Sequence, residues 1–309
     1  MQNKPLFSII IPHYNIPEML DKLLSSIPND LRIEVIVVDD KSNKNLETYN
    51  ACKDNHANKN IYFVDNSSDE KGAGKCRNIG IEASNGEWLL FADSDDYFEE
   101  GFLSTLLDSI DDEADLILYP PKSVSTETGM ASDRHLEQAL LIRDYMNNSS
   151  YQNELRLRFL FVAPWSKLIR ASLVREMNIR FENHKIANDI MFSRKVGVYA
   201  NKIKAFPESI YCVSYREGSI TTWTDVDSFD IWFASWLEST LFVKRQLSSR
   251  DWKLAGINGS SFIEKCIRNR YGLKKVISVC IILLRNGISP VSSIRTALGT
   301  LIYILKLRT

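Results

Sequence analysis

The stretch EWLLFADSDDYF, residues 87–98, is the most informative part of the chain, because an apolar run leads straight into acids. Residues 87–92 have the composition of a strand that is buried on both faces. Asp93, Asp95 and Asp96 follow it directly. In open α/β sheets, ligands bind where loops leave the carboxyl ends of the strands. The stretch therefore predicts a buried strand that ends at a ligand site.

The chain around this stretch repeats the same kind of element. Short apolar, β-branched runs alternate with segments of helical period over the first 120 residues, which is the pattern of parallel βαβ units. The other predicted strands are residues 7–11, 33–38, 61–64 and 115–119. We expect an α/β fold with a Rossmann-like, mostly parallel sheet flanked by helices.

Composition limits the possible classes of protein. With 309 residues, 44% hydrophobic and 25% charged, the chain can bury one large core or two smaller ones. Its five cysteines have no C-x-x-C spacing, so neither a disulfide framework nor a zinc site is indicated. The formal net charge is −1, and no nucleic-acid partner is expected. The first apolar run is too short for a signal peptide, and we expect a cytoplasmic location.

Polar residues follow three of the predicted strands. The first strand is followed by PHYN, which contains Pro12 and Tyr14, and the second by DDKS, which contains Asp39 and Asp40. Because the carboxyl ends of parallel strands meet at one edge, these residues are expected to surround a ligand. Each loop also has a simpler explanation, since Asp39, Asp40 or Asn15 could cap the helix that follows.

The acids after residue 92 have the chemistry of a metal site. Asp93 and Asp95 are separated by one residue, so in an extended loop both side chains can face one point while Ser94 turns away. Clustered carboxylates repel one another unless a cation lies between them. Hard oxygen ligands suit Mg²⁺ or Mn²⁺, with water and phosphate oxygens as the remaining ligands. The pattern predicts a metal that bridges to a diphosphate; a solvated acidic turn is the alternative.

The segment EKGAGKCRNIGIEAS, residues 70–84, adds positive charge near the same edge. Its glycines lead into a predicted helix, and it carries Lys71, Lys75 and Arg77. It matches neither the phosphate loop of ATPases nor the G-x-G-x-x-G dinucleotide motif. A phosphatase of the D-x-D-x-[TV] type would need Thr or Val where Tyr97 stands.

Taken together, these motifs resemble those of family 2 glycosyltransferases of the bacterial surface-polysaccharide type, which have the GT-A nucleotide-sugar fold. The matching segments are FSIIIPHYN, VIVVDDKS, GAGKCRNIGIEASNGEWLLFADSDDYF, PWSKLIRASLV, NDIMF and YCVSYREGSIT, in the order of the family. The resemblance covers residues 5–222. The combination R-N-x-G, D-x-D, W-x-K-L and [EN]-D is its most specific part.

The resemblance implies a donor site for a nucleotide sugar, most commonly a UDP-sugar. The residues that it places around the nucleotide sugar are Pro12, Tyr14, Asp39, Asp40, Lys71, Arg77, Asp93 and Ser94. Asp95 would ligate Mn²⁺ or Mg²⁺ directly, and Asp93 would approach the ribose or a metal-bound water.

The resemblance also implies an acceptor side and a catalytic base. Trp165 and Lys167 would line the acceptor side, and Asp189 would be the general base of an inverting transfer to a saccharide or lipid-linked glycan acceptor. The family usually has Glu before this Asp, whereas this chain has Asn188, which keeps the base but alters acceptor contacts or its pKa. Asp189 could instead be an N-cap or first-turn acid of the next helix.

The last third of the chain is expected to be a separate region. We predict a catalytic domain over residues 1–222 and a helical C-terminal region over residues 223–309. Residues 215–222 are expected to form a loop that closes over the donor, with Arg216 as a candidate phosphate contact. A helix over residues 227–246 has an aromatic face, which indicates packing or, alternatively, a sugar platform.

The C-terminal tail is strongly basic. Residues 265–309 contain nine Lys and Arg and no acid, around apolar stretches about half as long as a spanning helix needs. Such a segment predicts contact with an anionic membrane surface, with the protein peripheral on the inner face of the cell membrane. The alternative is a pair of amphipathic helices packed on the catalytic domain.

Two other functions compete with glycosyl transfer. One is a catalytically idle scaffold of the same fold that binds carbohydrate or membrane. The other is a nucleotidyltransferase, which usually has a Gly-rich, basic loop after the first strand, where this chain has PHYN.

Overall fold

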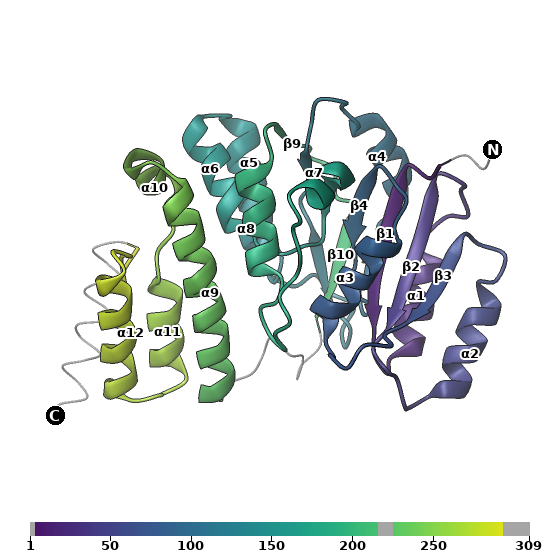
Figure 1. The fold of residues 1–309 in the computed structure, drawn as a ribbon, viewed down its shortest axis with the longest axis horizontal. Helices are drawn as coiled ribbons and strands as arrows, with labels where there is room; N and C mark the ends of the chain where they lie inside the picture. Colours follow the sequence, from purple (N-terminus) through teal and green to yellow (C-terminus); the bar gives the residue numbers. More distant parts are fainter. Residues whose placement is uncertain (1–3, 216–224, 293–309) are drawn as a thin grey trace.

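The computed structural model describes residues 4–215 and 225–292. A seven-stranded sheet with helices on both faces forms one part of the molecule, and a group of helices from the C-terminal region forms the other (Figure 1). The strand order is β3-β2-β1-β4-β8-β6-β9. The predicted Rossmann-like α/β fold is confirmed.

The seven strands are β1 (Phe7–His13), β2 (Ile33–Asp39), β3 (Ile61–Asp65), β4 (Trp88–Phe91), β6 (Leu116–Leu118), β8 (Lys167–Arg170) and β9 (Ile203–Ala205). All five predicted strands are present. β1 pairs in parallel with β2 and β4, so the loops that follow these strands leave the same edge of the sheet. β8 was not predicted; it lies antiparallel to β4 and β6 and makes the sheet mixed.

The helices before the C-terminal group are α1 (Pro17–Ser25), α2 (Leu46–Asn55), α3 (Ala73–Ala83), α4 (Phe102–Ser109), α5 (Leu136–Asn147), α6 (Tyr151–Leu160), α7 (Ala171–Glu176) and α8 (Ile190–Tyr199). α1 buries Leu20, Leu23 and Leu24, as its period predicts. α3 packs closely on β1, because a Cβ at Gly80 would lie only 2.3 Å from Ile10 Cγ2.

A second, three-stranded sheet has the order β5-β10-β7. Its strands are β5 (Tyr97–Phe98), β7 (Lys122–Ser125) and β10 (Tyr211–Tyr215). Residues 120–133 have the polar composition of a loop, but residues 122–125 form β7, because pairing with β10 supplies the hydrogen bonds that stabilise this strand. β9 and β10 follow each other along the chain but belong to different sheets.

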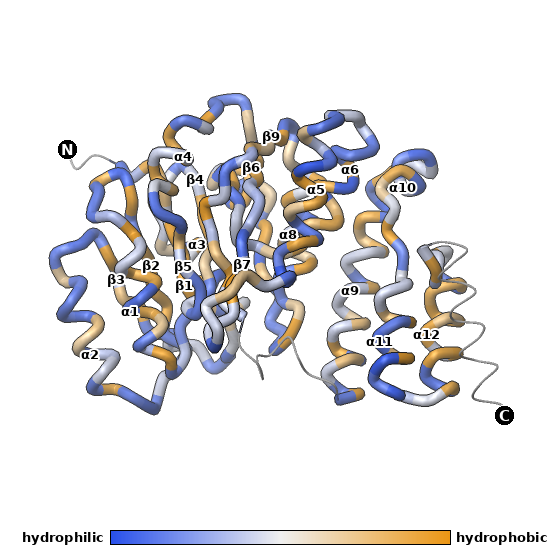
Figure 2. Tube along the Cα trace, turned by 180° about the vertical axis from the view of Figure 1, so that it is seen from behind, coloured by the Kyte–Doolittle hydropathy of each residue, from blue (hydrophilic) through white to orange (hydrophobic). Residues whose placement is uncertain are grey.

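The C-terminal group consists of α9 (Val226–Gln246), α10 (Ser249–Ala255), α11 (Ser260–Arg268) and α12 (Leu273–Arg285). Its hydrophobic core also takes in Leu155, Phe159 and Ile190 from α6 and α8. Figure 2 shows hydrophobic and hydrophilic residues alternating along these helices, which is the pattern of helices with one buried face. The packing interpretation of the predicted aromatic face is confirmed for Phe229, Phe233, Trp236 and Val243.

A buried arginine joins the two parts of the molecule. Arg194 on α8 donates hydrogen bonds from Nη1 to the Trp236 carbonyl, Ser239 Oγ and Thr240 Oγ1 on α9. Burial lowers the pKa of Arg194 to about 9. These bonds fix α9 against the helix that begins directly after Asp189.

Several predictions concern residues outside the described ranges. The domain boundary after residue 222, the loop that contains Arg216 and the tail from residue 293 onward all lie outside them. The division into two domains therefore stays a prediction. Among the described residues, no helix combines the length and apolarity that crossing a bilayer requires.

Candidate active site

The loops after β1 and β2 hold each other in place. His13 Nδ1 lies 2.8 Å from Asp39 Oδ1, and the Ser42 amide donates to Asp39 Oδ2. Burial opposes ionisation of Asp39, but the hydrogen bonds with His13 and Ser42 outweigh it and lower its pKa. Asn15 Oδ1 accepts from the amides of residues 43 and 44. The alternative that Asp39, Asp40 or Asn15 caps the following helix is wrong, since neither α1 nor α2 has a side-chain N-cap bond.

Asp40 ties together the loops that follow β2 and β3. Its Oδ2 accepts from the Gly72 amide and its Oδ1 from Asn66 Nδ2, both at 2.8 Å. Gly72 immediately precedes α3, so Asp40 fixes the start of that helix. Asn66 follows β3 and was not among the predicted residues, because a single Asn after a strand carries no specific signal.

The exposed part of this edge consists of an aromatic ring and a cation. The Tyr14 side chain is 48% exposed, and Lys71 Nζ lies 5.8 Å from the centre of its ring. Pro12 is buried within β1. Ser94 is also buried, and its Oγ donates to the Pro12 carbonyl at 2.5 Å. A donor contact through the Ser94 hydroxyl would require this bond to break.

The three acids after β4 have different environments. Asp96 is buried, accepts from Tyr211 Oη at 2.8 Å and from the Ser214 amide at 2.7 Å, and so anchors β10. Burial, together with the negative charges of Asp93 and Asp95, raises the pKa of Asp96 well above its ordinary value. Asp96 therefore has a structural role. The spacing of the three acids in the sequence could not distinguish this role from metal binding.

Asp93 and Asp95 have the donor chemistry for a divalent cation. The Asp93 side chain is 34% exposed and Asp95 is partly buried, so both are within reach of a ligand at this edge. The negative charges of Asp93 and Asp95 disfavour ionisation of Asp96, and a cation bound by these carboxylates would reduce that repulsion. Carboxylate oxygens fit Mn²⁺ or Mg²⁺, and two carboxylates leave positions for water and diphosphate oxygens.

Arg77 connects these acids to the segment that carries Asp189. Its Nη2 donates to Asp93 Oδ1 at 2.5 Å and its Nη1 to Asn188 Oδ1 at 2.8 Å. Because Asn188 is neutral, Asp93 is the acid that pairs with Arg77 in the described part of the chain.

The Asn188 segment lies tightly against α3. A Cβ at Gly74 would lie 2.2 Å from the Glu182 carbonyl oxygen and 3.1 Å from Asn188 Cβ, so this position requires glycine. Ala187 has a positive φ of 58°, which is a strained conformation for a residue with a side chain. Asp189 occupies the N-cap position of α8, as the alternative interpretation predicts, but its side chain makes no capping hydrogen bond there.

The electrostatic environment of Asp189 includes two cations, Arg77 and Lys167. Burial raises the pKa of Asp189 above its ordinary value, while the positive charges of Arg77 and Lys167 oppose this shift. Lys167 is buried behind the site, where its Nζ donates to the Phe161 carbonyl at 2.6 Å. Burial also lowers the pKa of Lys167, to about 7. The charge of Lys167 therefore acts on Asp189, but Lys167 is not among the residues that line the cavity beside Asp189.

A single cavity of about 400 Å³ extends from Asp93 to Asp189. Asp93, Asp189 and Trp165 line it, as do residues that the sequence did not single out as site residues: Arg134, Gln138 and Lys265. Phe229 and Trp232 of α9 line it as well, so the aromatic face of this helix packs along most of its length and meets the cavity at these two rings. The sequence could not show these neighbours, because three separate elements bring them together.

The mostly parallel sheet, flanked by helices and with paired acids at the end of β4, has the architecture of the GT-A fold. The model of glycosyl transferase family 2 matches residues 8–177. The chain belongs to this family, and the resemblance seen in its motifs is confirmed.

Curated relatives match over much of this chain. Glycosyltransferase GlyA of Streptococcus pneumoniae is 27% identical over 227 residues, which are 71% of this chain and 32% of that protein. The poly(ribitol-phosphate) beta-N-acetylglucosaminyltransferase TarS of Staphylococcus aureus is 28% identical over 219 residues, which are 69% of this chain and 36% of that protein. This chain therefore spans about a third of the length of these relatives.

Solved structures share the fold. S. aureus TarS 1–349 in complex with UDP-GlcNAc has a TM-score of 0.58 at 20% identity, covering 92% of both chains. The mannosyltransferase PcManGT of Pyrobaculum calidifontis, in complex with GDP-Man and Mn²⁺, has a TM-score of 0.58 at 14% identity. It covers 99% of this chain and 84% of the mannosyltransferase.

Proposed function

We propose that this protein is an inverting glycosyltransferase that moves a sugar from a nucleoside diphosphate, in the first instance UDP, to a saccharide or lipid-linked acceptor. The observation that carries the proposal is that Asp93 and Asp189, which come from different elements, line one cavity. The names of the relatives support a role in surface polysaccharide synthesis, since TarS is named for transfer to poly(ribitol-phosphate).

The donor half of the site would hold the nucleotide and the diphosphate. Tyr14 offers an exposed ring to the base, and Asp39 and Asp40 fix the loops beside it. As the sugar leaves, negative charge develops on the departing phosphate, and Arg77 and Lys71 would stabilise this charge. Asp95 and Asp93 would hold Mn²⁺ or Mg²⁺, which when bound neutralises diphosphate charge.

The acceptor half would activate a hydroxyl. Asp189 would take the hydroxyl proton as the oxygen attacks the anomeric carbon opposite the departing diphosphate. A carboxylate whose pKa is raised by burial holds a proton more firmly, which favours this transfer. One base and one displacement invert the anomeric centre. Trp165 would bound the space for the acceptor sugar, and Asn188 would hold Arg77 in place.

A donor screen tests the proposal. The measurement is the release of nucleoside diphosphate from a panel of nucleotide sugars with Mn²⁺ or Mg²⁺, with and without an acceptor extract. We expect release from one donor in preference to the others, together with a product of inverted configuration. Release of pyrophosphate from a nucleoside triphosphate would support a nucleotidyltransferase instead, and no release from any donor would support an idle scaffold.

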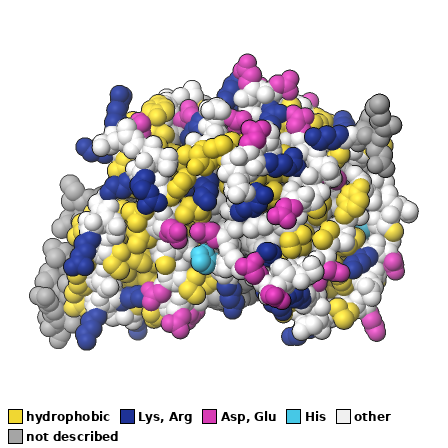
Figure 3. Space-filling model, viewed as in Figure 1, with side chains coloured by type: hydrophobic (Ala, Val, Ile, Leu, Met, Phe, Trp, Pro, Cys, Tyr) yellow, Lys and Arg dark blue, Asp and Glu magenta, His cyan; other side chains and the backbone are white. Residues whose placement is uncertain are grey.

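We also propose that α12 contacts an anionic membrane surface, which would place the enzyme beside a lipid-linked acceptor. α12 buries Val276, Val279 and Leu283 against the helical group, so the packed-helix alternative describes one of its faces. The other face leaves three apolar side chains exposed, at 42%, 41% and 61%: Ile277, Ile281 and Leu284. Figure 3 shows Lys and Arg mixed with hydrophobic side chains over this end of the molecule.

Liposome sedimentation tests this contact. The wild-type chain is expected to sediment with anionic vesicles at low salt and to be partly released at high salt. The double variant Ile277→Ser and Ile281→Ser should bind more weakly. Ile231→Ser, which changes an exposed residue of α9, is the matched control. Equal binding of all three proteins, or none, would contradict the proposal.

A further inference from the structure

Two cations line the cavity beside Asp189 without a carboxylate partner. Arg134 lies in the segment before α5, and Lys265 lies on α11. In the described ranges, neither forms an ion pair. Half-buried cations that face a cavity without an acid beside them are positioned to meet an anionic ligand.

Both side chains are held in place by their neighbours. Lys265 Nζ lies 4.4 Å from the centre of the Trp232 ring, and that ring lies 4.6 Å from the ring of Phe262. Arg134 Nη1 donates to the Ser214 carbonyl at 3.5 Å. The next residue, His135, has its Nδ1 2.7 Å from Ser123 Oγ on β7. The small sheet thus positions Arg134, and the C-terminal helices position Lys265.

The acids of the cavity do not cancel these two charges. Asp93 pairs with Arg77, and the charges of Arg77 and Lys167 act on Asp189. Glu137 is the remaining acid in the described cavity wall, and it is exposed in the first turn of α5. The part of the wall away from the reacting groups therefore carries net positive charge.

The same wall also offers groups that suit a polyhydroxylated ligand. Gln138 Oε1 is buried and has no hydrogen-bond partner in the described chain, so it can accept a bond from a ligand hydroxyl. The rings of Trp165 and Trp232 supply apolar surface of the kind on which sugar rings stack.

From these observations we infer that the acceptor is a polyhydroxylated chain that carries phosphate groups, and that Arg134 and Lys265 bind one of these groups while Asp189 faces the reacting hydroxyl. The inference rests on the proposed function and extends it to the substrate class. It also assigns the C-terminal helices, through Trp232 and Lys265, a direct part in acceptor choice. The phosphate could belong to the repeating unit of the acceptor or to the diphosphate of a lipid carrier.

Calorimetry on the full chain with saturating UDP and Mn²⁺ tests the inference with three probes. They are a short alditol-phosphate oligomer, a sugar diphosphate with a short alkyl chain, and a neutral oligosaccharide of similar length. The wild type should bind at least one phosphate-bearing probe about ten-fold more tightly than the neutral one. Whichever of the two binds more tightly identifies the source of the phosphate.

Three variants assign the effect to the two cations. Arg134→Met and Lys265→Met should each lower affinity for the preferred probe about ten-fold and leave affinity for the neutral probe little changed. Lys253→Met, on the exposed side of α10, is the matched control and should behave as wild type. UDP binding by each variant shows that it is folded and that its donor site is intact.

The outcomes separate this inference from the proposed function. If the wild type binds all probes equally or binds none, or if the variants keep the wild-type preference, the inference is overturned. A positive donor screen would leave the glycosyltransferase proposal standing in each of those cases. Failure of every donor in that screen would overturn the proposed function and this inference with it.

Discussion

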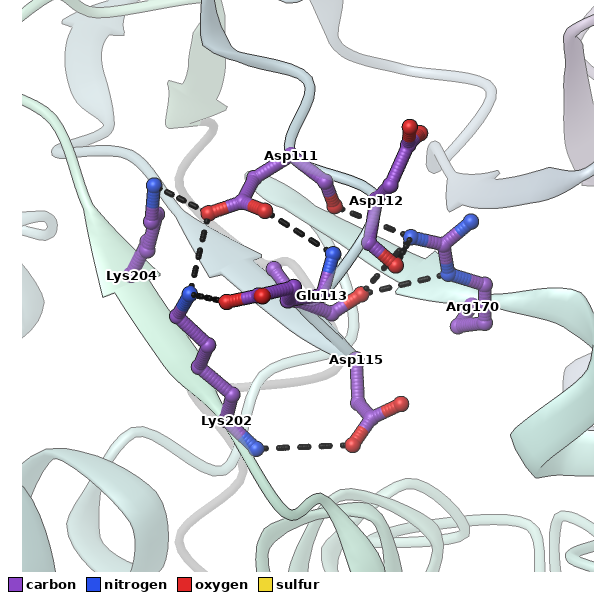
Figure 4. A network of polar contacts seen from close by, with 8 residues as sticks. Asp111, Asp112, Glu113, Asp115, Arg170, Lys202 and Lys204 are labelled. Carbon is purple, nitrogen blue, oxygen red and sulfur yellow. Dashed lines mark hydrogen bonds and ion pairs between the residues drawn. The ribbon is translucent and has the colours of Figure 1, made fainter.

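Two groups of acids in this molecule have similar sequences and opposite environments. The first follows β4 and contains Asp93, Asp95 and Asp96. The second precedes β6 and contains Asp111, Asp112, Glu113 and Asp115 (Figure 4). In the second group, Lys202 Nζ lies 3.3 Å from Asp111 Oδ2 and 2.5 Å from Glu113 Oε2, and Lys204 also pairs with Asp111.

The comparison shows that the negative charges of the two groups have different surroundings in the fold. Hydrogen bonding to Lys204 is the main cause that lowers the pKa of Asp111, so this acid is already neutralised within the protein. Arg170 donates to the carbonyls of residues 111, 112 and 114 and closes the loop. Near β4 the opposite holds, since burial and two neighbouring acids raise the pKa of Asp96. In the second group Lys202 and Lys204 compensate the acids, whereas in the first group Asp93 pairs with Arg77 and we expect Asp93 and Asp95 also to bind a cation.

The largest effect is expected for Asp189, the proposed base, which lines the same cavity as Asp93. Asp189→Asn keeps the shape of the side chain but removes the proton acceptor, so the transfer rate should fall about 10² to 10⁴-fold. UDP affinity should change little, because the proposed role of Asp189 is on the acceptor side. Transfer at the wild-type rate would show that another residue acts as the base.

A large effect on stability is expected for Asp96. Asp96→Ala leaves the Ser214 amide and the Tyr211 hydroxyl without their acceptor, at a cost of about 1–3 kcal/mol for each buried group. Urea denaturation would measure this loss in the free energy of unfolding. The matched change in the second group, Asp112→Ala, should cost far less because Asp112 is exposed. Equal losses would remove the distinction between the two groups.

A smaller effect is expected on the pH dependence of the transfer rate. Asp189 must be ionised to accept a proton, and its raised pKa places the acid limb of the transfer rate above the ordinary range of an Asp. The Lys167 charge lowers that pKa, so Lys167→Met should move the acid limb to higher pH. A pH profile of kcat/KM, with UDP binding as the folding control, checks the shift. An unchanged limb, or one at lower pH, would contradict the role of Lys167.

The smallest effect is expected in the second group itself. Asp111→Ala removes exposed ion pairs, which contribute little to stability and are screened by salt. Tm should fall slightly at low salt and recover relative to wild type at high salt, while donor hydrolysis stays unchanged. A loss of donor hydrolysis would mean that the second group also belongs to the active site.

Much of the fold was predictable because it depends on local patterns. The parallel strands are continuous apolar runs, and each of the first two ends at a polar loop, as the structure confirms for β1 and β2. β7 and β8 were missed because neither is a continuous apolar run, and their hydrogen bonds come from partners far along the chain.

The site was predictable where one short segment carries the chemistry. Asp93, Arg77 and Asp189 were named from motifs, and the structure brings them together. Arg134, Gln138 and Lys265 were not, because only the packing of α5 and α11 around the cavity brings them near Asp189. The different roles of Asp95 and Asp96 also required the contacts made by Tyr211 and Ser214.

The most direct test of the central claim is calorimetry of UDP with and without Mn²⁺ on three proteins: wild type, Asp95→Ala and Asp111→Ala. If the group after β4 keeps its negative charge for a cation that holds the diphosphate, Mn²⁺ should strengthen UDP binding in wild type and in Asp111→Ala. It should have no effect in Asp95→Ala, which should remain folded. Equal metal-assisted binding in all three proteins would contradict the claim, because Asp95 would then not be the ligand that holds the metal.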